Sequence, residues 1–267
     1  MPILSKKRKF ITLFTIIGIL TAITAEAKLG TQTAINNQLT GLLISQKTSP
    51  KKVWKILPIG DSLTEGQGKE GYQSYRGHLY NLLQKGRYQV DFIGPQNKTT
   101  LAGGDPDHAG FGGYTIGPDE SKFCQNCPKA NIYDNLPKIL SNKADVILLL
   151  IGINDLLPVK DRPVNPKDAA QKLENLVKKI KETQPQAKIL VSSLLQVGWT
   201  NNEWTDYFAV NKKARELGEK SSSDKIYFVD LNKVKLEEKD FTDKLHLTDN
   251  GARKVAEGWY QALKANL

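Results

Sequence analysis

Short apolar runs alternate with amphipathic helical patterns from residue 53 onward, and this alternation constrains the fold more than any other feature of the chain. The apolar runs are VWKILPIG (53–60), VDFIGP (90–95), DVILLLIG (145–152), KILVSSLL (188–195) and KIYFVDL (225–231). They are rich in Val, Ile and Leu, which is typical of strands buried on both faces. The helical patterns cover 74–85, 131–142, 166–183, 205–220 and 249–264.

An alternation of strands and helices predicts an α/β fold in which a parallel sheet carries helices on both faces. In such sheets, ligands bind beyond the carboxyl ends of the strands. The residues that directly follow each apolar run are therefore the first candidates for a functional site.

The first run ends in Gly60-Asp61-Ser62-Leu63-Thr64, a small turn with hydroxyl side chains. A plain tight turn is one interpretation. The other is a nucleophilic serine at the edge of the sheet. A serine hydroxyl becomes an effective nucleophile only with a base that takes its proton and with donors that stabilise the oxyanion.

Candidates for both roles follow other strands. Asn154, in GIND after the third run, carries a carboxamide that can donate a hydrogen bond to an oxyanion. The loop HAGFGGYTI (108–116) is dense in glycine and includes Gly113. Asp243 and His246, in DKLH before the last helix, pair a base with an orienting carboxylate.

Four other polar residues are assigned smaller roles. Asp61 and Asp155 adjoin the candidate positions, and we interpret both as supports of their turns. His78 lies in a helical pattern and is expected to be structural. His108 lies in a loop, either as a support or as a substrate contact.

Together these segments resemble the SGNH (GDSL-type) esterase superfamily over about residues 52–265. GDSLT resembles its first block, with Ser62 as nucleophile, and Gly113 in GFGGYT matches the glycine of the second. Asn154 in GIND matches the third block, and DKLH matches the last through Asp243 and His246. The resemblance implies a Ser-His-Asp triad and an oxyanion hole formed by Ser62, Gly113 and Asn154, with no metal or organic cofactor.

The resemblance also implies a three-layer α/β/α sandwich with five parallel strands in the flavodoxin-like order 2-1-3-4-5. The α/β-hydrolase fold is the alternative for a serine esterase. Its nucleophile turn has the pattern G-x-S-x-G, with a glycine two residues after the serine. Thr64 occupies that position here, which favours the looser SGNH turn.

SYRGHLYNLL (74–83), VDFIGP and HAGFGGYTI resemble the acetylxylan-esterase-like branch of the superfamily. That branch implies hydrolysis of small acyl esters, acetyl above all, on carbohydrate. Trp199 and Trp204 are candidate sugar contacts, with core packing as the alternative for each. A lipid or thioester hydrolase, an O-acetyltransferase and a carbohydrate-binding module are the alternative functions.

The N-terminus has the layout of a cleavable signal peptide over residues 1–27. A basic cluster (6–9) precedes the apolar run Phe10 to Ala25, and Ala25-Glu26-Ala27 fits a cleavage site. As a helix the run is roughly 24 Å long, short for a ~30 Å hydrocarbon core, so a retained anchor is the alternative. We expect a secreted or periplasmic protein with a polar extension (28–50), a hydrolase domain (51–267) and no stable membrane insertion after processing.

The net charge is +10, but the lysines are scattered along helical patterns, as on a solvated surface, and no nucleic-acid partner is predicted. Cys124 and Cys127 are the two cysteines of the chain. A zinc site needs four ligands and a second cysteine pair does not exist, so a local disulfide in an exported loop is preferred over a redox pair. Two unpaired thiols are the other alternative. We expect a monomer that acts on a small ester or an acetylated polysaccharide.

Overall fold

The computed structural model describes residues 31–32, 52–67, 71–118, 130–157, 164–196, 204–219 and 224–267. Residues Lys52–Leu267 form one compact unit, separate from Met1–Lys51. The predicted signal segment, the Cys124–Cys127 pair and Trp199 lie outside the described residues, as does the side chain of Trp204. In the part of the chain that is described, no helix is both long and apolar enough to cross a bilayer.

Five parallel strands form the main sheet, in the spatial order β2-β1-β5-β6-β7. Their bounds are β1 Val53–Gly60, β2 Gln89–Phe92, β5 Val146–Leu150, β6 Lys188–Ser192 and β7 Ile226–Val229. Numbered along the chain these are strands 2-1-3-4-5, so the predicted order of the long strands is confirmed. Every residue of β5 is buried, as expected for a strand covered on both faces.

Two short strands were not predicted, so the sheet has seven strands among the described residues where five were expected. Strand β4 (Asp107–Gly110) runs parallel to the end of β1, and β3 (Gln96–Asn97) pairs antiparallel with β4. Strand β2 pairs with the first half of β1. Strand β4 pairs with the last two residues of β1, on the same side as β2. Strand β4 has the sequence DHAG, so it lacks the apolar run from which the long strands were predicted.

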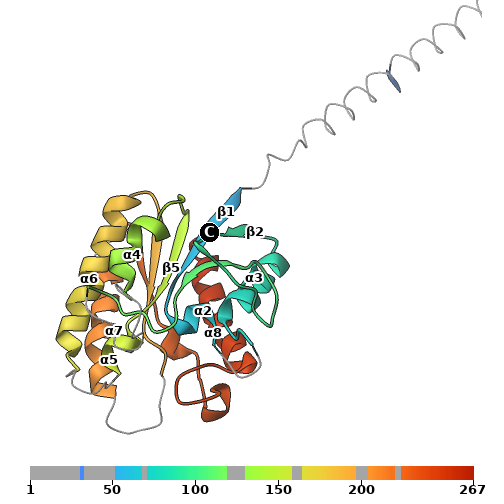
Figure 1. Cartoon of the computed structure of the whole chain (residues 1–267). Coiled ribbons are helices and arrows are strands. Elements are labelled where there is room, and N and C mark those ends of the chain that lie inside the picture. The colour runs from blue at the N-terminus through green and yellow to red at the C-terminus, as the bar shows by residue number, and fades with distance from the viewer. Residues whose placement is uncertain are drawn as a thin grey trace, which may run out of the picture. The chain divides into compact units, whose positions relative to one another are not determined.

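The long helices cover the two faces of the sheet, with α3 and α8 on one face and α6 and α7 on the other (Figure 1). The helices are α2 Ser62–Glu65, α3 Tyr75–Lys85, α4 Ile132–Ile139, α5 Ile153–Leu156, α6 Pro166–Thr183, α7 Trp204–Glu219 and α8 Asp249–Lys264, with single 3₁₀ turns at Leu231–Lys233 and Glu238–Asp240. The predictions for α6 and α8 are confirmed to the residue. The segment 131–142 ends earlier than predicted, at Ile139.

Local capping explains where these helices begin. Asn165 accepts a hydrogen bond from the Asp168 N–H, and Pro166 occupies the first turn of α6, where its missing N–H costs nothing. Thr248 caps α8 through the Gly251 N–H. The apolar stripe predicted for α6 is buried, and it packs that helix on the sheet.

Candidate active site

Ser62 is the first residue of α2, the short helix that follows β1. The Asp61 side chain caps this helix, because its Oδ1 accepts a hydrogen bond from the Leu63 N–H at 3.0 Å. Ser62 is only 3% exposed. The turn at the end of β1 therefore holds the serine at a fixed place on the edge of the sheet.

The turn around Ser62 is not strained. Among the described residues other than glycine, Arg87 and Lys225 have a positive φ, whereas Ser62 is helical. Thr64, which stands where an α/β-hydrolase has its second glycine, is buried with its Oγ1 at 3.2 Å from the Tyr75 hydroxyl. The looser turn inferred from Thr64 agrees with this geometry.

The register of the sheet brings three loops to one edge. Gly60 at the end of β1 lies opposite Gly110 of β4 on one side and Leu150 of β5 on the other. The segments that leave these strands carry Ser62, the glycine loop and Asn154. Residues far apart in the sequence therefore emerge together at the carboxyl ends of the strands.

Gly110 allows α2 to lie directly on β4. A Cβ at this position would be 2.3 Å from the backbone nitrogen of Glu65, closer than any side chain permits. The helix that begins with Ser62 can approach the glycine loop this closely only because the residue lacks a side chain.

His246 links Ser62 to Asp243 in a hydrogen-bonded chain. Its Nε2 lies 3.1 Å from Ser62 Oγ, and its Nδ1 lies 2.8 Å from Asp243 Oδ2. The backbone of His246 is also fixed, because the Thr242 N–H donates a hydrogen bond to the His246 carbonyl oxygen at 2.8 Å. Such a chain can pass the serine proton to the imidazole and stabilise the imidazolium that results.

The environment of Asp243 favours its ionised form. Burial raises its pKa, but hydrogen bonds from the His246 ring, the His246 N–H and the Leu245 N–H outweigh burial and hold the pKa below its ordinary value. Both N–H groups donate to Oδ1 at 2.7 Å, which leaves Oδ2 directed at the imidazole. The carboxylate therefore stays ionised in weakly acidic solution, where it continues to orient His246.

Gly113 and Asn154 meet at the glycine loop. Gly113 has a φ of 75°, in a tight turn closed by the Tyr114 N–H to the Phe111 oxygen at 3.2 Å. The rings of Phe111 and Tyr114 stack across this turn with centroids 4.7 Å apart. Asn154 Nδ2 donates to the Tyr114 oxygen at 2.9 Å, which holds the carboxamide beside the loop.

Glu65 connects the helix of the serine to the glycine loop, a role that we did not predict. Its Oε2 accepts a hydrogen bond from the Gly112 N–H at 2.6 Å, and its Oε1 forms an ion pair with Lys98. The residue is 9% exposed. Since Gly112 lies 47 positions along the chain, no local sequence pattern signals this contact.

Arg76 supports the same region and was also missed. It is fully buried, its Nε donates to the Thr64 oxygen at 2.8 Å, and its Nη2 donates to the Glu65 oxygen at 3.1 Å. Further bonds go to the carbonyl oxygens of Lys98 and Pro106. Burial lowers its pKa to about 10, so the guanidinium remains charged at neutral pH. A cation at the end of α2 satisfies carbonyls that the short helix leaves unpaired.

The two flanking aspartates contact backbone. Asp155 accepts a hydrogen bond from the Ile116 N–H at 3.1 Å, and Asp61 caps α2. Burial raises the pKa of Asp61 to about 7. Both contacts agree with the interpretation of these residues as supports of their turns.

The other two histidines lie apart from this chain. His108 was expected in a loop, but it belongs to β4, is fully buried and accepts the Gly110 N–H at its Nδ1. Burial lowers its pKa to about 3. His78 on α3 contacts Asp249 of α8 at 2.8 Å, a structural link between the helices. Among the described residues, no three His, Cys, Asp or Glu side chains come together as metal ligands do.

A hollow of about 660 Å³ opens beside the hydrogen-bonded chain. One wall comes from the segment after α2 and includes Gln67 and Tyr72. The other comes from the loop before α8 and includes Thr242, Asp243 and His246. A ligand in this hollow reaches the imidazole directly.

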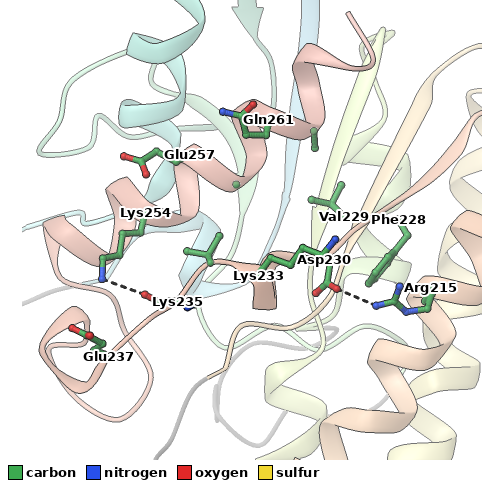
Figure 2. A pocket seen from close by; sticks show the side chains of 13 residues that line it. Arg215, Phe228, Val229, Asp230, Lys233, Lys235, Glu237, Lys254, Glu257 and Gln261 are labelled. Atoms are coloured by element: carbon green, nitrogen blue, oxygen red, sulfur yellow. Dashed lines mark hydrogen bonds and ion pairs between the residues drawn. The ribbon is translucent and has the colours of Figure 1, made fainter.

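A different hollow, of about 840 Å³, lies between β7 and α8 (Figure 2). Its charged side chains are largely engaged with one another or with neighbours. Arg215 is paired with Asp230 at 3.0 Å, and Lys254 with Asp240 at 2.7 Å. Asp243 and His246 do not line it, whereas both line the smaller hollow, so the chemistry described above points to the smaller hollow.

Comparison with known proteins gives a family and an architecture. The profile of the GDSL-like lipase/acylhydrolase family matches residues 59–254. A multidomain esterase from Ruminococcus flavefaciens is 28% identical over 265 residues. The alignment covers 90% of this chain but 32% of that protein, so the chain spans about a third of the length of this curated relative.

Solved structures share the fold. A family 3 carbohydrate esterase from Clostridium thermocellum is 28% identical with a TM-score of 0.63, over 80% of this chain and 98% of the other. A carbohydrate esterase family 3 protein from Talaromyces cellulolyticus has a TM-score of 0.62 over 80% and 97%, and at 18% identity it supports the fold alone. The chain therefore belongs to the GDSL-like lipase/acylhydrolase family.

Proposed function

We propose that the protein removes acetyl groups from carbohydrate, with Ser62, His246 and Asp243 as its catalytic triad. The observation that carries this proposal is the hydrogen-bonded chain in which His246 lies 3.1 Å from Ser62 Oγ and 2.8 Å from Asp243. A serine so paired has the base that its chemistry requires.

In the first half of the reaction, His246 Nε2 takes the proton of Ser62 as Oγ bonds to the ester carbonyl carbon. The oxyanion that forms accepts hydrogen bonds from the N–H groups of Ser62 and Gly113 and from the Asn154 side chain. A single donor of this kind is worth roughly 2.7–4 kcal/mol. The carbonyl then re-forms, the bond to the alcohol oxygen breaks, and His246 gives its proton to that oxygen.

In the second half, water attacks the acetyl group on Ser62. His246 accepts a proton from the water, and the same donors stabilise the second oxyanion. The ester bond to Oγ breaks, Oγ regains the proton from His246, and acetate leaves. Asp243 remains a carboxylate throughout and keeps the Nδ1 proton directed toward itself.

Carbohydrate as the substrate is supported by the likeness to a carbohydrate esterase at 28% identity over nearly all of that structure. The acetyl group follows from the resemblance of SYRGHLYNLL, VDFIGP and HAGFGGYTI to acetylxylan esterases. The two kinds of support are independent of the hydrogen-bonded chain, which supports attack by a serine nucleophile without indicating the substrate.

The proposal includes export. The basic cluster, the apolar run Phe10 to Ala25 and Ala25-Glu26-Ala27 support removal of residues 1–27 as a signal peptide. The product would carry a polar extension (28–50) before a monomeric hydrolase domain (51–267), secreted or periplasmic. N-terminal sequencing of the exported protein tests this, with a start near Lys28 expected and an intact Met1 contradicting it.

Acetate release from acetylated xylan, measured beside a series of p-nitrophenyl esters of increasing acyl length, tests the substrate. We expect acetate release from xylan and the highest kcat/KM with the acetyl ester, both lost in Ser62→Ala. Higher turnover of long acyl chains would instead indicate a lipid hydrolase. Transfer of the acetyl group to an added sugar in preference to water would indicate an acetyltransferase.

A further inference from the structure

Tyr72 is an exposed aromatic side chain beside the triad. The side chain is 41% exposed, and it forms part of the wall of the 660 Å³ hollow that His246 also lines. The proposed function so far gives Tyr72 no role. An exposed ring at the mouth of an active site is a candidate contact for a ligand.

The ring of Tyr72 is held in place although it is exposed. Its backbone oxygen accepts the Leu101 N–H at 3.0 Å, which anchors the segment. The Lys98 ammonium lies over the ring, 4.8 Å from its centroid, and Lys98 is in turn fixed by its ion pair with Glu65. A ring that is already fixed loses little conformational entropy when a ligand covers it.

Polar groups accompany the ring. Gln67 is exposed on the same wall, and its side-chain Nε2 lies so near Gly112 that a Cβ there would be 2.5 Å away. Its carboxamide therefore stands between the hollow and the glycine loop. Thr242 lines the opposite wall, and its hydroxyl donates to the His246 oxygen at 3.2 Å.

The place of the hollow determines which part of the substrate enters it. His246 must give its proton to the leaving oxygen, so the alcohol lies on the side of the imidazole. The hollow is lined by His246 and by Asp243, and the alcohol portion of the ester therefore extends into it. An apolar ring face beside a carboxamide matches a pyranose, which has a C–H face and hydroxyl groups at its rim.

We propose that Tyr72 and Gln67 form the subsite that binds the sugar ring bearing the acetyl group. This inference rests on the proposed function, and it adds the residues that select a sugar as the alcohol. Tyr72 stacks on the C–H face of the ring and Gln67 hydrogen-bonds its hydroxyls.

The test compares kcat/KM for acetate release from an acetylated xylo-oligosaccharide with kcat/KM for ethyl acetate, whose alcohol has no ring. Tyr72→Ala and Tyr72→Leu should lower the ratio of the two values about tenfold, as expected for the loss of one ring contact. Tyr72→Phe should keep the ratio within about threefold of the wild type, because the ring face remains. Gln67→Ala should lower it by a smaller factor.

Phe208→Ala on α7 is the matched control, since Phe208 is also an exposed aromatic, at 66%. It should leave the ratio unchanged. An unchanged ratio in Tyr72→Leu, or a loss in Tyr72→Phe as large as in Tyr72→Ala, would overturn the ring-stacking subsite. A wild-type protein that releases acetate from neither ester would instead contradict the proposed function itself.

Discussion

Glu65 shows how one side chain can set the geometry of a site that it does not enter. It lies three residues after Ser62 and binds the Gly112 N–H, so it ties the helix of the proposed nucleophile to the loop that carries Gly113, the proposed oxyanion donor. Lys98 balances its charge. We therefore regard Glu65 as a positioning residue.

Glu65→Ala should lower kcat on a small acetyl ester about tenfold with little change in KM, because displaced oxyanion donors weaken the transition state more than the ground state. Glu65→Gln should recover part of the loss, since its amide oxygen can still accept the Gly112 N–H. Steady-state kinetics with a thermal melt as the folding control measures this. Equal losses in both variants, or a change confined to KM, would contradict the positioning role.

The raised pKa of Asp61 predicts how the free energy of unfolding changes with pH. Its pKa is 3.8 ordinarily and about 7 when buried in the folded chain. Between these values the folded state holds a proton that the unfolded state has lost, so this contribution to stability falls as the pH rises toward 7. Above that pH the folded chain contains a buried carboxylate.

Asp61→Asn removes this titration while its Oδ1 can still cap α2. From pH 5 to pH 8, the free energy of unfolding of the variant should improve relative to wild type by roughly 3 kcal/mol, at about 1.4 kcal/mol for each of the two units between pH 5 and the pKa. Urea unfolding of both proteins at the two pH values measures it. A difference that does not change with pH would show that Asp61 does not titrate in this range.

At the scale of elements, we propose that α2 and the loop before α8 contribute one functional unit, because Ser62 and His246 are 184 positions apart in the sequence and meet at 3.1 Å. Their losses should therefore not add: Ser62→Ala/His246→Ala should be about as inactive as Ser62→Ala. Asp243→Ala should be milder, since in the proposed mechanism Asp243 orients the base without touching substrate. Measured kcat/KM values for these variants test whether the losses add. A kcat/KM of the double variant far below that of Ser62→Ala would mean that the two residues act independently.

The long elements were predictable because each carries its own signal. Strand β5 is continuously apolar, and α6 has an apolar stripe with a cap and a proline at its start. Strand β4 lacks such a signal, since DHAG becomes a strand by pairing with the end of β1 and with β3. Because this strand was not predicted, His108 was expected in a loop, whereas it is buried in the sheet.

The same distinction applies to the site. Ser62, Asn154 and His246 could be proposed from the sequence because each follows a recognisable strand or precedes a recognisable helix. Glu65 and Arg76 were missed because they bind backbone groups, 47 and 11–30 positions away respectively, that only the folded chain brings near. The sequence gives the residue types that could react, whereas the long-range contacts that position them depend on the folded structure.

For the whole molecule, the division at Lys52 predicts that the hydrolase folds without the preceding segment. A chain that begins at Lys52 keeps the complete sheet, both helical layers and every contact described for the site. It should show a cooperative thermal transition and a kcat/KM on a small acetyl ester within about twofold of the full chain. A shortened protein that is soluble but lacks a cooperative transition would show that the division is wrong.

The central claim, that Ser62 is a nucleophile activated by His246, is tested most directly by labelling the full chain with a fluorophosphonate and mapping the modified peptide. The serine displaces fluoride from phosphorus, so the label marks the activated hydroxyl. Ser193 is the matched control, a buried serine that follows β6 at the carboxyl edge of the same sheet. We predict one label on Ser62, no label in Ser62→Ala, slow labelling in His246→Ala and unchanged labelling in Ser193→Ala. Labelling of Ser62→Ala at the wild-type rate would contradict the account.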